Sequence, residues 1–196
     1  NGSEEFVATA SDGDLSSSQS FTVTVNAVND APVLAAVDTV TFAEDGSLSI
    51  NLSASDVDGD DLTYSVTGGE QITATVDGTT VSFAATQDFN GSEEFTATVS
   101  DGNLVASQTF TVTVTAVNDA PVLAAVDTVS FDEDDSLSIT LSASDVDGDD
   151  LTYSISGGTN IEATVVGTTV NFIASQDFNG SEEFVATASD GDLSSS

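Results

Sequence analysis

The sequence predicts an all-β chain made of tandem, two-layer β-sandwiches. Three observations support this fold class: apolar and polar residues alternate in short segments, turn residues separate these segments, and the pattern repeats along the chain. The hexapeptide Asn-Gly-Ser-Glu-Glu-Phe begins at Asn1, Asn90 and Asn179, so one repeat is 89 residues long. No helical periodicity appears anywhere in the sequence.

Seven alternating segments account for one complete repeat. In the segment 48–54, for example, the apolar residues Leu48, Ile50 and Leu52 alternate with serine and asparagine, which places them on one face of a strand. Because each strand has one apolar face, the strands must pack face to face as two sheets. Strands are expected at 37–42, 48–54, 62–66, 72–76, 81–85, 95–99 and 110–116, with glycine-containing turns between them.

The repeat divides the chain into three parts. Residues 1–28 carry the last strands of a preceding repeat, residues 29–118 form a complete repeat, and residues 119–196 form a second repeat that lacks its last strand. The connections between repeats contain no spacer rich in glycine, serine or proline, so neighbouring repeats are expected to follow one another end to end. The incomplete ends leave two explanations open: the sequence is an excised fragment, or residues of one copy complete another by strand donation.

The charge composition excludes several classes of function. The chain has 34 acidic residues and no lysine, arginine or histidine, so nothing in it can neutralise the phosphates of nucleic acid or an anionic membrane surface. No apolar run is long enough to insert into a membrane, and no signal peptide is visible. Cysteine is absent, so the fold is expected to depend on packing and on bound metal rather than on disulfides.

An acidic octapeptide, Ser-Asp-Val-Asp-Gly-Asp-Asp-Leu, occupies residues 55–62 and recurs unchanged at 144–151. Carboxylates this close repel one another by roughly 1 kcal/mol per pair at 4 Å even in water, and no basic side chain is available to pair with them. A hard divalent cation with oxygen ligands would relieve the repulsion, and Ca²⁺ fits best. The alternative is a solvated acidic turn. An EF-hand loop is excluded, because the sixth position from Asp56 is Asp61 rather than glycine.

The repeat resembles cadherin repeats. The segment 54–66, Ala-Ser-Asp-Val-Asp-Gly-Asp-Asp-Leu-Thr-Tyr-Ser-Val, is similar to the cadherin motif with alternating aspartates before a Leu-x-Tyr strand. The segment 6–33 resembles the cadherin strand, Asp-Gly turn and strand that end in Asn-Asp-x-x-Pro. The pattern is most similar to the cadherin-like tandem repeats of large bacterial surface and biofilm adhesins. This resemblance implies tandem seven-stranded cadherin- or immunoglobulin-like β-sandwiches joined end to end.

The resemblance also implies Ca²⁺ at the junctions between successive repeats. The residues implied at the junction between the two main repeats are Glu44, Asp88, Asn90, Asn118, Asp119, Asp145, Asp147, Asp150 and Asp190. Those implied at the preceding junction are Asn29, Asp30, Asp56, Asp58, Asp61 and Asp101. The sequence departs from the cadherin pattern at Asn90, where cadherins carry an acidic residue, so fewer or more weakly bound ions are expected.

The resemblance, together with the acidic octapeptides, implies a calcium-rigidified structural extender of a large extracellular bacterial adhesin, secreted or on the cell surface. Its expected partners are neighbouring repeats and, end to end, other copies, with any carbohydrate or cell-surface partner bound elsewhere in the full protein. Two alternatives remain open: a module that itself binds carbohydrate or a partner, and a subunit of a surface filament assembled by strand donation.

The acidic pairs outside the octapeptides predict no catalytic site. Paired carboxylates can hydrolyse glycosides, but the chain has no tryptophan, its two tyrosines lie at inward positions, and its acids belong to a repeating pattern. No enzyme activity is therefore expected. The pairs Glu93-Glu94 and Glu182-Glu183 are interpreted as solvated strand edges.

Overall fold

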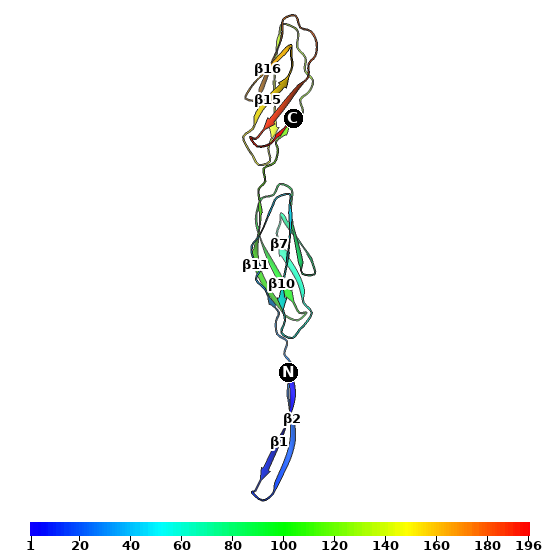
Figure 1. Ribbon diagram of the computed structural model, residues 1–196, viewed down its shortest axis with the longest axis vertical. Coiled ribbons are helices and arrows are strands. Elements are labelled where there is room, and N and C mark those ends of the chain that lie inside the picture. The colour runs from blue at the N-terminus through cyan, green and yellow to red at the C-terminus, as the bar shows by residue number, and fades with distance from the viewer. The chain divides into compact units, whose positions relative to one another are not determined.

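The computed structural model describes all residues, 1–196, and consists of strands connected by turns (Figure 1). It divides into two units, 1–115 and 116–196, and each is described by itself. Each unit holds a two-sheet sandwich, so the predicted all-β fold class is confirmed. The structure contains no helix with the length and apolar character needed to span a membrane.

The first unit begins with a long two-stranded hairpin, drawn in blue in Figure 1. Strand β1 (Gly2–Ser11) pairs antiparallel with β2 (Ser16–Val25), with Phe6 opposite Phe21. The two rings stack with their centroids 5.8 Å apart. Every residue of both strands is exposed, although the alternation of apolar and polar residues is that of a half-buried strand.

A sandwich of two main sheets forms the rest of the first unit. One sheet has the order β4-β11-β10-β7, with β4 (Val40–Ala43), β11 (Val105–Thr115), β10 (Gly91–Ser100) and β7 (Thr63–Gly68). The other has the order β5-β9-β8, with β5 (Ser47–Asn51), β9 (Thr80–Ala85) and β8 (Ile72–Asp77). The first and last strands, β4 and β11, pair in parallel, while the other pairs are antiparallel. Between the sheets, Phe83 and Phe95 are fully buried and meet edge to face.

Two expected strands of this sandwich, hereafter the first domain, are shortened because part of each expected segment pairs elsewhere. The segment 48–54 is divided, because β5 ends at Asn51 and a separate strand β6 (Ala54–Ser55) pairs with β3 (Val33–Leu34) instead of β9. The strand expected from residue 37 begins only at Val40. The backbone of Val37 pairs with the side-chain amide of Gln108, which donates to the Val37 carbonyl at 3.2 Å and accepts from its N–H at 3.3 Å. A side chain thus takes the place of a neighbouring strand at this point.

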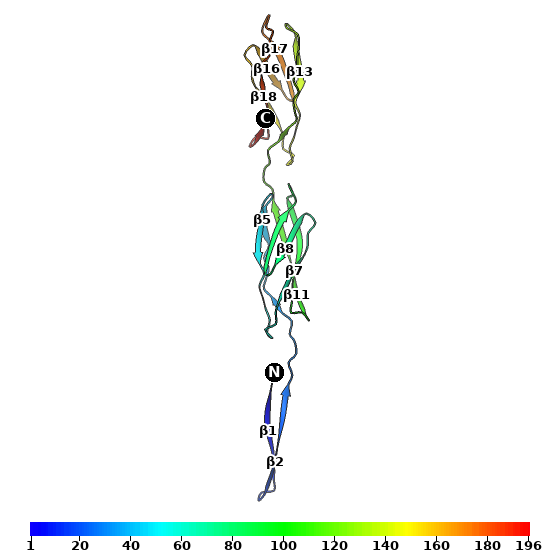
Figure 2. The same cartoon turned by 90° about the vertical axis from the view of Figure 1, so that its right-hand side faces the viewer.

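The second unit repeats this arrangement with fewer strands (Figure 2). One sheet has the order β13-β17-β16, with β13 (Ser136–Thr140), β17 (Thr169–Ala174) and β16 (Ile161–Val166). The other has the order β15-β18-β19, with β15 (Thr152–Gly157), β18 (Phe184–Ser189) and the short β19 (Ser194–Ser195). A third pair joins β12 (Val122–Leu123) to β14 (Ala143–Ser144).

The second sandwich has a smaller core because it contains no counterpart of most of β11. The buried apolar cluster of this sandwich, hereafter the second domain, consists of Leu141, Val170 and Phe172. The segment 129–132 corresponds to β4 of the first domain but is not a strand, since β11 is the strand that β4 pairs with. Val129 is accordingly 47% exposed, whereas its counterpart Val40 is 5% exposed.

Candidate metal centre

An aspartate cluster occupies the loop that follows β6. Asp56, Asp58 and Asp60 each place a carboxylate oxygen within 4.8 Å of the others. The loop folds around Asp56, whose Oδ1 accepts the backbone N–H groups of Asp58 at 2.8 Å and Gly59 at 3.1 Å. Gly59 has φ +82°, a left-handed conformation that favours glycine. The turn therefore brings alternate aspartates back toward Asp56.

The second unit contains the same cluster after β14. Asp145, Asp147 and Asp149 place their oxygens within the same 4.8 Å limit. Oδ1 of Asp145 accepts the N–H groups of Asp147 at 3.0 Å and Gly148 at 3.2 Å. Two copies of the octapeptide thus fold into the same loop in separate domains.

The electrostatics of both clusters favour a cation. Oδ2 of Asp56 is buried and accepts no hydrogen bond, and the same is true of Oδ2 of Asp145. Such an atom is unfavourable without a partner, because it has lost its water. Desolvation raises the pKa of Asp60, and the charges of Asp56 and Asp58 raise it further. The pKa of Asp149 is raised by the corresponding causes. A bound cation would favour the charged carboxylates and so lower the pKa of both groups.

The chain that enters the first domain is hydrogen-bonded beside the cluster. The backbone N–H of Asp30 donates to Oδ2 of Asp58 at 2.9 Å. The side-chain amide of Asn29 donates to Oδ2 of Asp101 at 2.9 Å. The predicted ligands Asn29, Asp30, Asp58 and Asp101 therefore lie in one connected network at this end of the domain.

The second unit has the same network at its own entry. The N–H of Asp119 donates to Oδ2 of Asp147 at 2.8 Å, and the Asn118 amide donates to Oδ2 of Asp190 at 3.0 Å. The backbone N–H of Leu193 and then the Asn118 amide lower the pKa of Asp190. Asp190 is thus held in its charged form close to the entering chain.

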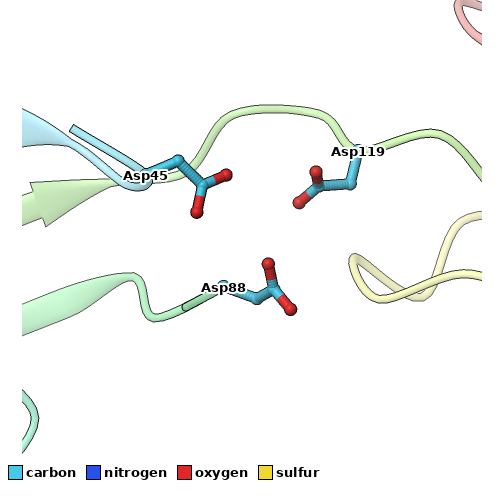
Figure 3. A group of neighbouring side chains, drawn as sticks. All are labelled: Asp45, Asp88 and Asp119. Atoms are coloured by element: carbon cyan, nitrogen blue, oxygen red, sulfur yellow. The ribbon is translucent and has the colours of Figure 1, made fainter. Parts of the chain in front are cut away.

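Two further aspartates of the first unit point toward each other, as Figure 3 shows. Asp45 lies in the turn after β4 and Asp88 in the loop after β9, and their carboxylate oxygens approach within 4.8 Å. Both have left-handed backbones, with φ of +60° and +56°, which aspartate tolerates better than most residues. Asp119, also drawn in Figure 3, belongs to the second unit and is described above.

The acidic residues that the structure brings close together include some of the predicted ligands and some residues that were not predicted. Asp60 and Asp149 complete the two octapeptide clusters, whereas Asp61 and Asp150, chosen from the sequence, are not among the grouped residues. The spacing of two residues between Asp56, Asp58 and Asp60 is the sequence signal that points to Asp60.

A similar difference appears in the turn after β4. Asp45, which the sequence did not single out, is the residue grouped with Asp88, while the predicted ligand Glu44 is only 4% exposed. Asn90 is exposed and is not among the grouped residues, which are all acidic. Glu44 and Asn90 therefore stay predictions.

The interpretation of Glu93 as part of a solvated strand edge is wrong. Its carboxylate accepts three backbone N–H groups of the turn between β7 and β8, from Glu70, Gln71 and Ile72, at 3.0, 3.0 and 2.9 Å. Burial raises the pKa of Glu93, but these three donors together outweigh burial and lower it. Glu93 therefore stabilises a turn that lies more than twenty residues earlier in the chain.

Glu182 has the same role in the second unit. It accepts the backbone N–H groups of Thr159, Asn160 and Ile161 at 2.8, 2.9 and 2.9 Å. The donors, with Thr159 the strongest, lower the pKa of Glu182 from its ordinary value of 4.5 to about 2. Two structural carboxylates thus occupy equivalent positions in the two domains.

Replacing Glu182 with glutamine is expected to lower the melting temperature of the second domain by several degrees at neutral pH. The folded-state pKa is depressed, so the stabilisation is complete above the unfolded value near 4.5 and is lost as the pH falls toward 2. Melting curves of the wild type and Glu182→Gln should therefore converge near pH 2. The control is Glu183→Gln, which removes the same charge from an exposed neighbour. Equal melting of the two variants at pH 7 would contradict the assignment.

Comparison with known proteins bears on the family and the fold. A family model described as a bacterial Ig domain matches residues 29–115 and 118–196. No curated protein matches the sequence. The solved structure of human protocadherin-24 EC1-2 (form II) is 21% identical with a TM-score of 0.57, and the match covers 84% of this chain and 90% of that chain. This likeness shows the fold.

An enzyme structure also matches the chain, over a small part of its own length. An endo-fucoidan hydrolase of glycoside hydrolase family 107, MfFcnA4, is 20% identical with a TM-score of 0.40. The match covers 98% of this chain and 32% of the hydrolase chain, so this chain spans about a third of the hydrolase.

Proposed function

Because the chain belongs to the bacterial Ig domain family, we propose that it is a calcium-stiffened structural extender of an extracellular bacterial adhesin. The observation that carries the proposal is the buried Asp56 Oδ2, which accepts no hydrogen bond and lies in a cluster of three carboxylates. The same atom and the same cluster recur at Asp145 in the second domain. A role that each repeat performs in the same way is typical of a spacer.

The donor set suits calcium. Asp56, Asp58 and Asp60 would hold the ion in the first domain, and Asp145, Asp147 and Asp149 would hold it in the second. The ligand atoms are all carboxylate oxygens on short side chains. Ca²⁺ is a hard cation and prefers oxygen to softer ligands such as sulfur. A dissociation constant of about 10⁻⁴–10⁻³ M would be ordinary for an extracellular module.

The effect of the ion follows from the position of the entering chain. Asp58 accepts the N–H of Asp30, so a cation that fixes Asp58 also fixes the chain just before the domain. Asp147 and Asp119 have the same relation in the second domain. The bound ion supplies positive charge that offsets the repulsion among the aspartates. Loss of the ion is therefore expected to loosen each linker first.

Small-angle X-ray scattering with and without Ca²⁺ tests the proposal. In about 2 mM Ca²⁺, above the expected dissociation constants, we expect a long and stiff particle. Excess chelator should give a more flexible particle and a lower melting temperature. Identical scattering and melting in both conditions would refute calcium as the stiffening agent.

Matched variants distinguish the loss of a cluster carboxylate from a general loss of negative charge. The double variant Asp56→Asn, Asp145→Asn should be as flexible in Ca²⁺ as the wild type is in chelator, and should melt at a similarly low temperature. Each change removes the central carboxylate of one cluster. Asp77→Asn is the control, since Asp77 is an exposed aspartate at the end of β8 and is not among the grouped residues. If all these variants retain the response to calcium, the clusters are not the binding sites.

A further inference from the structure

An open groove runs along strand β5 of the first domain. It has a volume of about 480 Å³ and is lined by residues 35–41 and 48–53. The segment 35–41 leads into β4, and β5 belongs to the other sheet, so the groove lies at the seam between the two sheets. Leu48 and Ile50, which line it, pack against the core but are only half-buried. The groove therefore offers an apolar surface beside a strand.

The backbone of β5 is unpaired on the side of the groove. Strand β5, labelled in Figure 2, pairs with β9 on one side and with no strand on the other. The N–H of Leu52 donates to the Thr79 carbonyl at 2.8 Å, in register with the pairing of β5 and β9. Because the backbone groups of successive residues in an antiparallel strand point to alternate sides, those of Ser49 and Asn51 face away from β9. They form the free edge of the sheet.

The chain that enters the first domain covers only the far end of this edge. The N–H of Ala35 donates to the Ser53 carbonyl at 2.8 Å, on the side of the strand that faces away from β9. Beyond Ala35 the chain leaves this sheet, and the Gln108 side chain holds the backbone of Val37 beside β11. Strand β3 thus begins an added strand that the following residues do not continue, and the place beside β5 stays open.

The charges of the chain indicate what kind of strand can fill this place. Residues 47–53 contain no charged residue and no proline, which are common means of blocking an exposed edge. A second copy is disfavoured, because every charged side chain of this protein is acidic and copies repel one another. Asp38 lines the groove and is exposed. The groove is therefore suited to a strand that brings positive charge.

We propose that this groove binds an extended, cationic segment of a partner protein, which pairs antiparallel with β5 in line with β3. The backbone groups of Ser49 and Asn51 supply the hydrogen bonds, as in other cases of strand addition. A segment of about five residues follows β5 along its length, at about 3.4 Å per residue. Alternate side chains of the segment are apolar and cover Leu48 and Ile50. The intervening ones are lysine or arginine, attracted by Asp38 and by the net charge of −34.

The contact goes beyond the proposed role as a calcium-stiffened extender. None of the residues that form it belongs to an aspartate cluster, so its success or failure is separate from that of calcium binding. The measurement belongs at about 0.15 M salt, where charges more than about 8 Å apart are largely screened and general attraction to an acidic protein is weak.

Amide hydrogen exchange, followed by NMR on the 196-residue chain in Ca²⁺, tests the proposal with the peptide Lys-Val-Lys-Val-Lys-Val-Lys. The N–H groups of Ser49 and Asn51 should exchange rapidly in the free protein and become protected when the peptide is added. The control is Lys-Lys-Lys-Lys-Val-Val-Val, which has the same charge and composition but cannot present one apolar and one cationic face as a strand. It should protect neither amide.

Three outcomes of this measurement would overturn the proposal. The first is that the alternating peptide protects neither amide, and the second is that both peptides protect them equally. The third is protection without any peptide that increases with protein concentration, which would identify a second copy as the occupant of the groove.

Two changes at Ser49 test whether the backbone of β5 makes the contact. Ser49→Pro removes the N–H that faces the groove and should weaken binding of the alternating peptide about tenfold, as expected for the loss of one or two backbone hydrogen bonds. Because that N–H faces away from β9, proline does not remove a hydrogen bond between β5 and β9. Ser49→Ala loses the same hydroxyl, which pairs with that of Ser82 at 2.8 Å, but keeps the N–H and should bind like the wild type. Equal binding by the two variants would contradict strand addition, and the exchange measurement on the wild type does not depend on the folding of either.

Discussion

Phe95→Ala is expected to destabilise the first domain by about 3–5 kcal/mol, the range for losing a fully buried aromatic side chain. The Phe95 ring lies in contact with Phe83 and Phe110, with centroids 5.5 and 6.0 Å away. Its removal leaves a cavity bordered by both sheets, which the close-packed neighbours can only partly fill. Because typical domains are stable by about 5–15 kcal/mol, this loss is a large part of the total.

Urea denaturation, monitored by tyrosine fluorescence, measures this loss of stability in one domain at a time. Tyr64 is the only tyrosine of the first domain and Tyr153 the only one of the second, so a Tyr153→Phe background reports on the first alone. The internal control is Phe184→Ala, the equivalent change in the second domain, measured in a Tyr64→Phe background that reports on that domain. Phe184 is only partly buried and lacks a counterpart of Phe110, so the loss should be clearly smaller. Equal losses in the two domains would contradict the packing described above.

Gly69→Ala is expected to have the second largest effect. Gly69 lies in the turn between β7 and β8 with φ +76°, and a Cβ placed there would overlap the Ile72 carbonyl oxygen and the Phe95 ring. The left-handed backbone costs about 1–2 kcal/mol for a residue with a side chain. The overlap adds about 1–3 kcal/mol, since the turn and the core must shift. The expected change would be seen as a lower urea midpoint.

The matched control for Gly69 is Gly78→Ala in the turn between β8 and β9. Gly78 has a similar φ of +59°, but a Cβ there would meet nothing within 4 Å. Only the cost of the left-handed backbone remains, so the loss should be about 1–2 kcal/mol. If the two variants lose the same stability, crowding around Gly69 does not contribute.

The sandwich could be predicted from the sequence because its signals are local. Alternation of apolar and polar residues fixes which face of each strand is buried, and the 89-residue repeat fixes how many domains to expect. The same reasoning placed Asp56 and Asp58 in an acidic cluster, since they lie two residues apart in one loop. These features depend on neighbours in the chain.

The remaining features depend on contacts between distant residues. Glu93 accepts donors from a turn 21 to 23 residues earlier, and Gln108 pairs with Val37 across 71 residues. No local pattern marks either side chain.

The parallel pairing of β4 with β11 determines how the first domain would respond to a pulling force. The chain enters the sandwich through the two-residue strand β3 and then β4, and it leaves after β11. A force on the two ends therefore draws the neighbouring strands β4 and β11 in opposite directions along their length. The ladder from Val40–Val112 to Ala43–Thr115 is then loaded in shear, with its hydrogen bonds strained together rather than one after another. A domain connected in this way resists extension far better than one whose terminal strands are peeled apart.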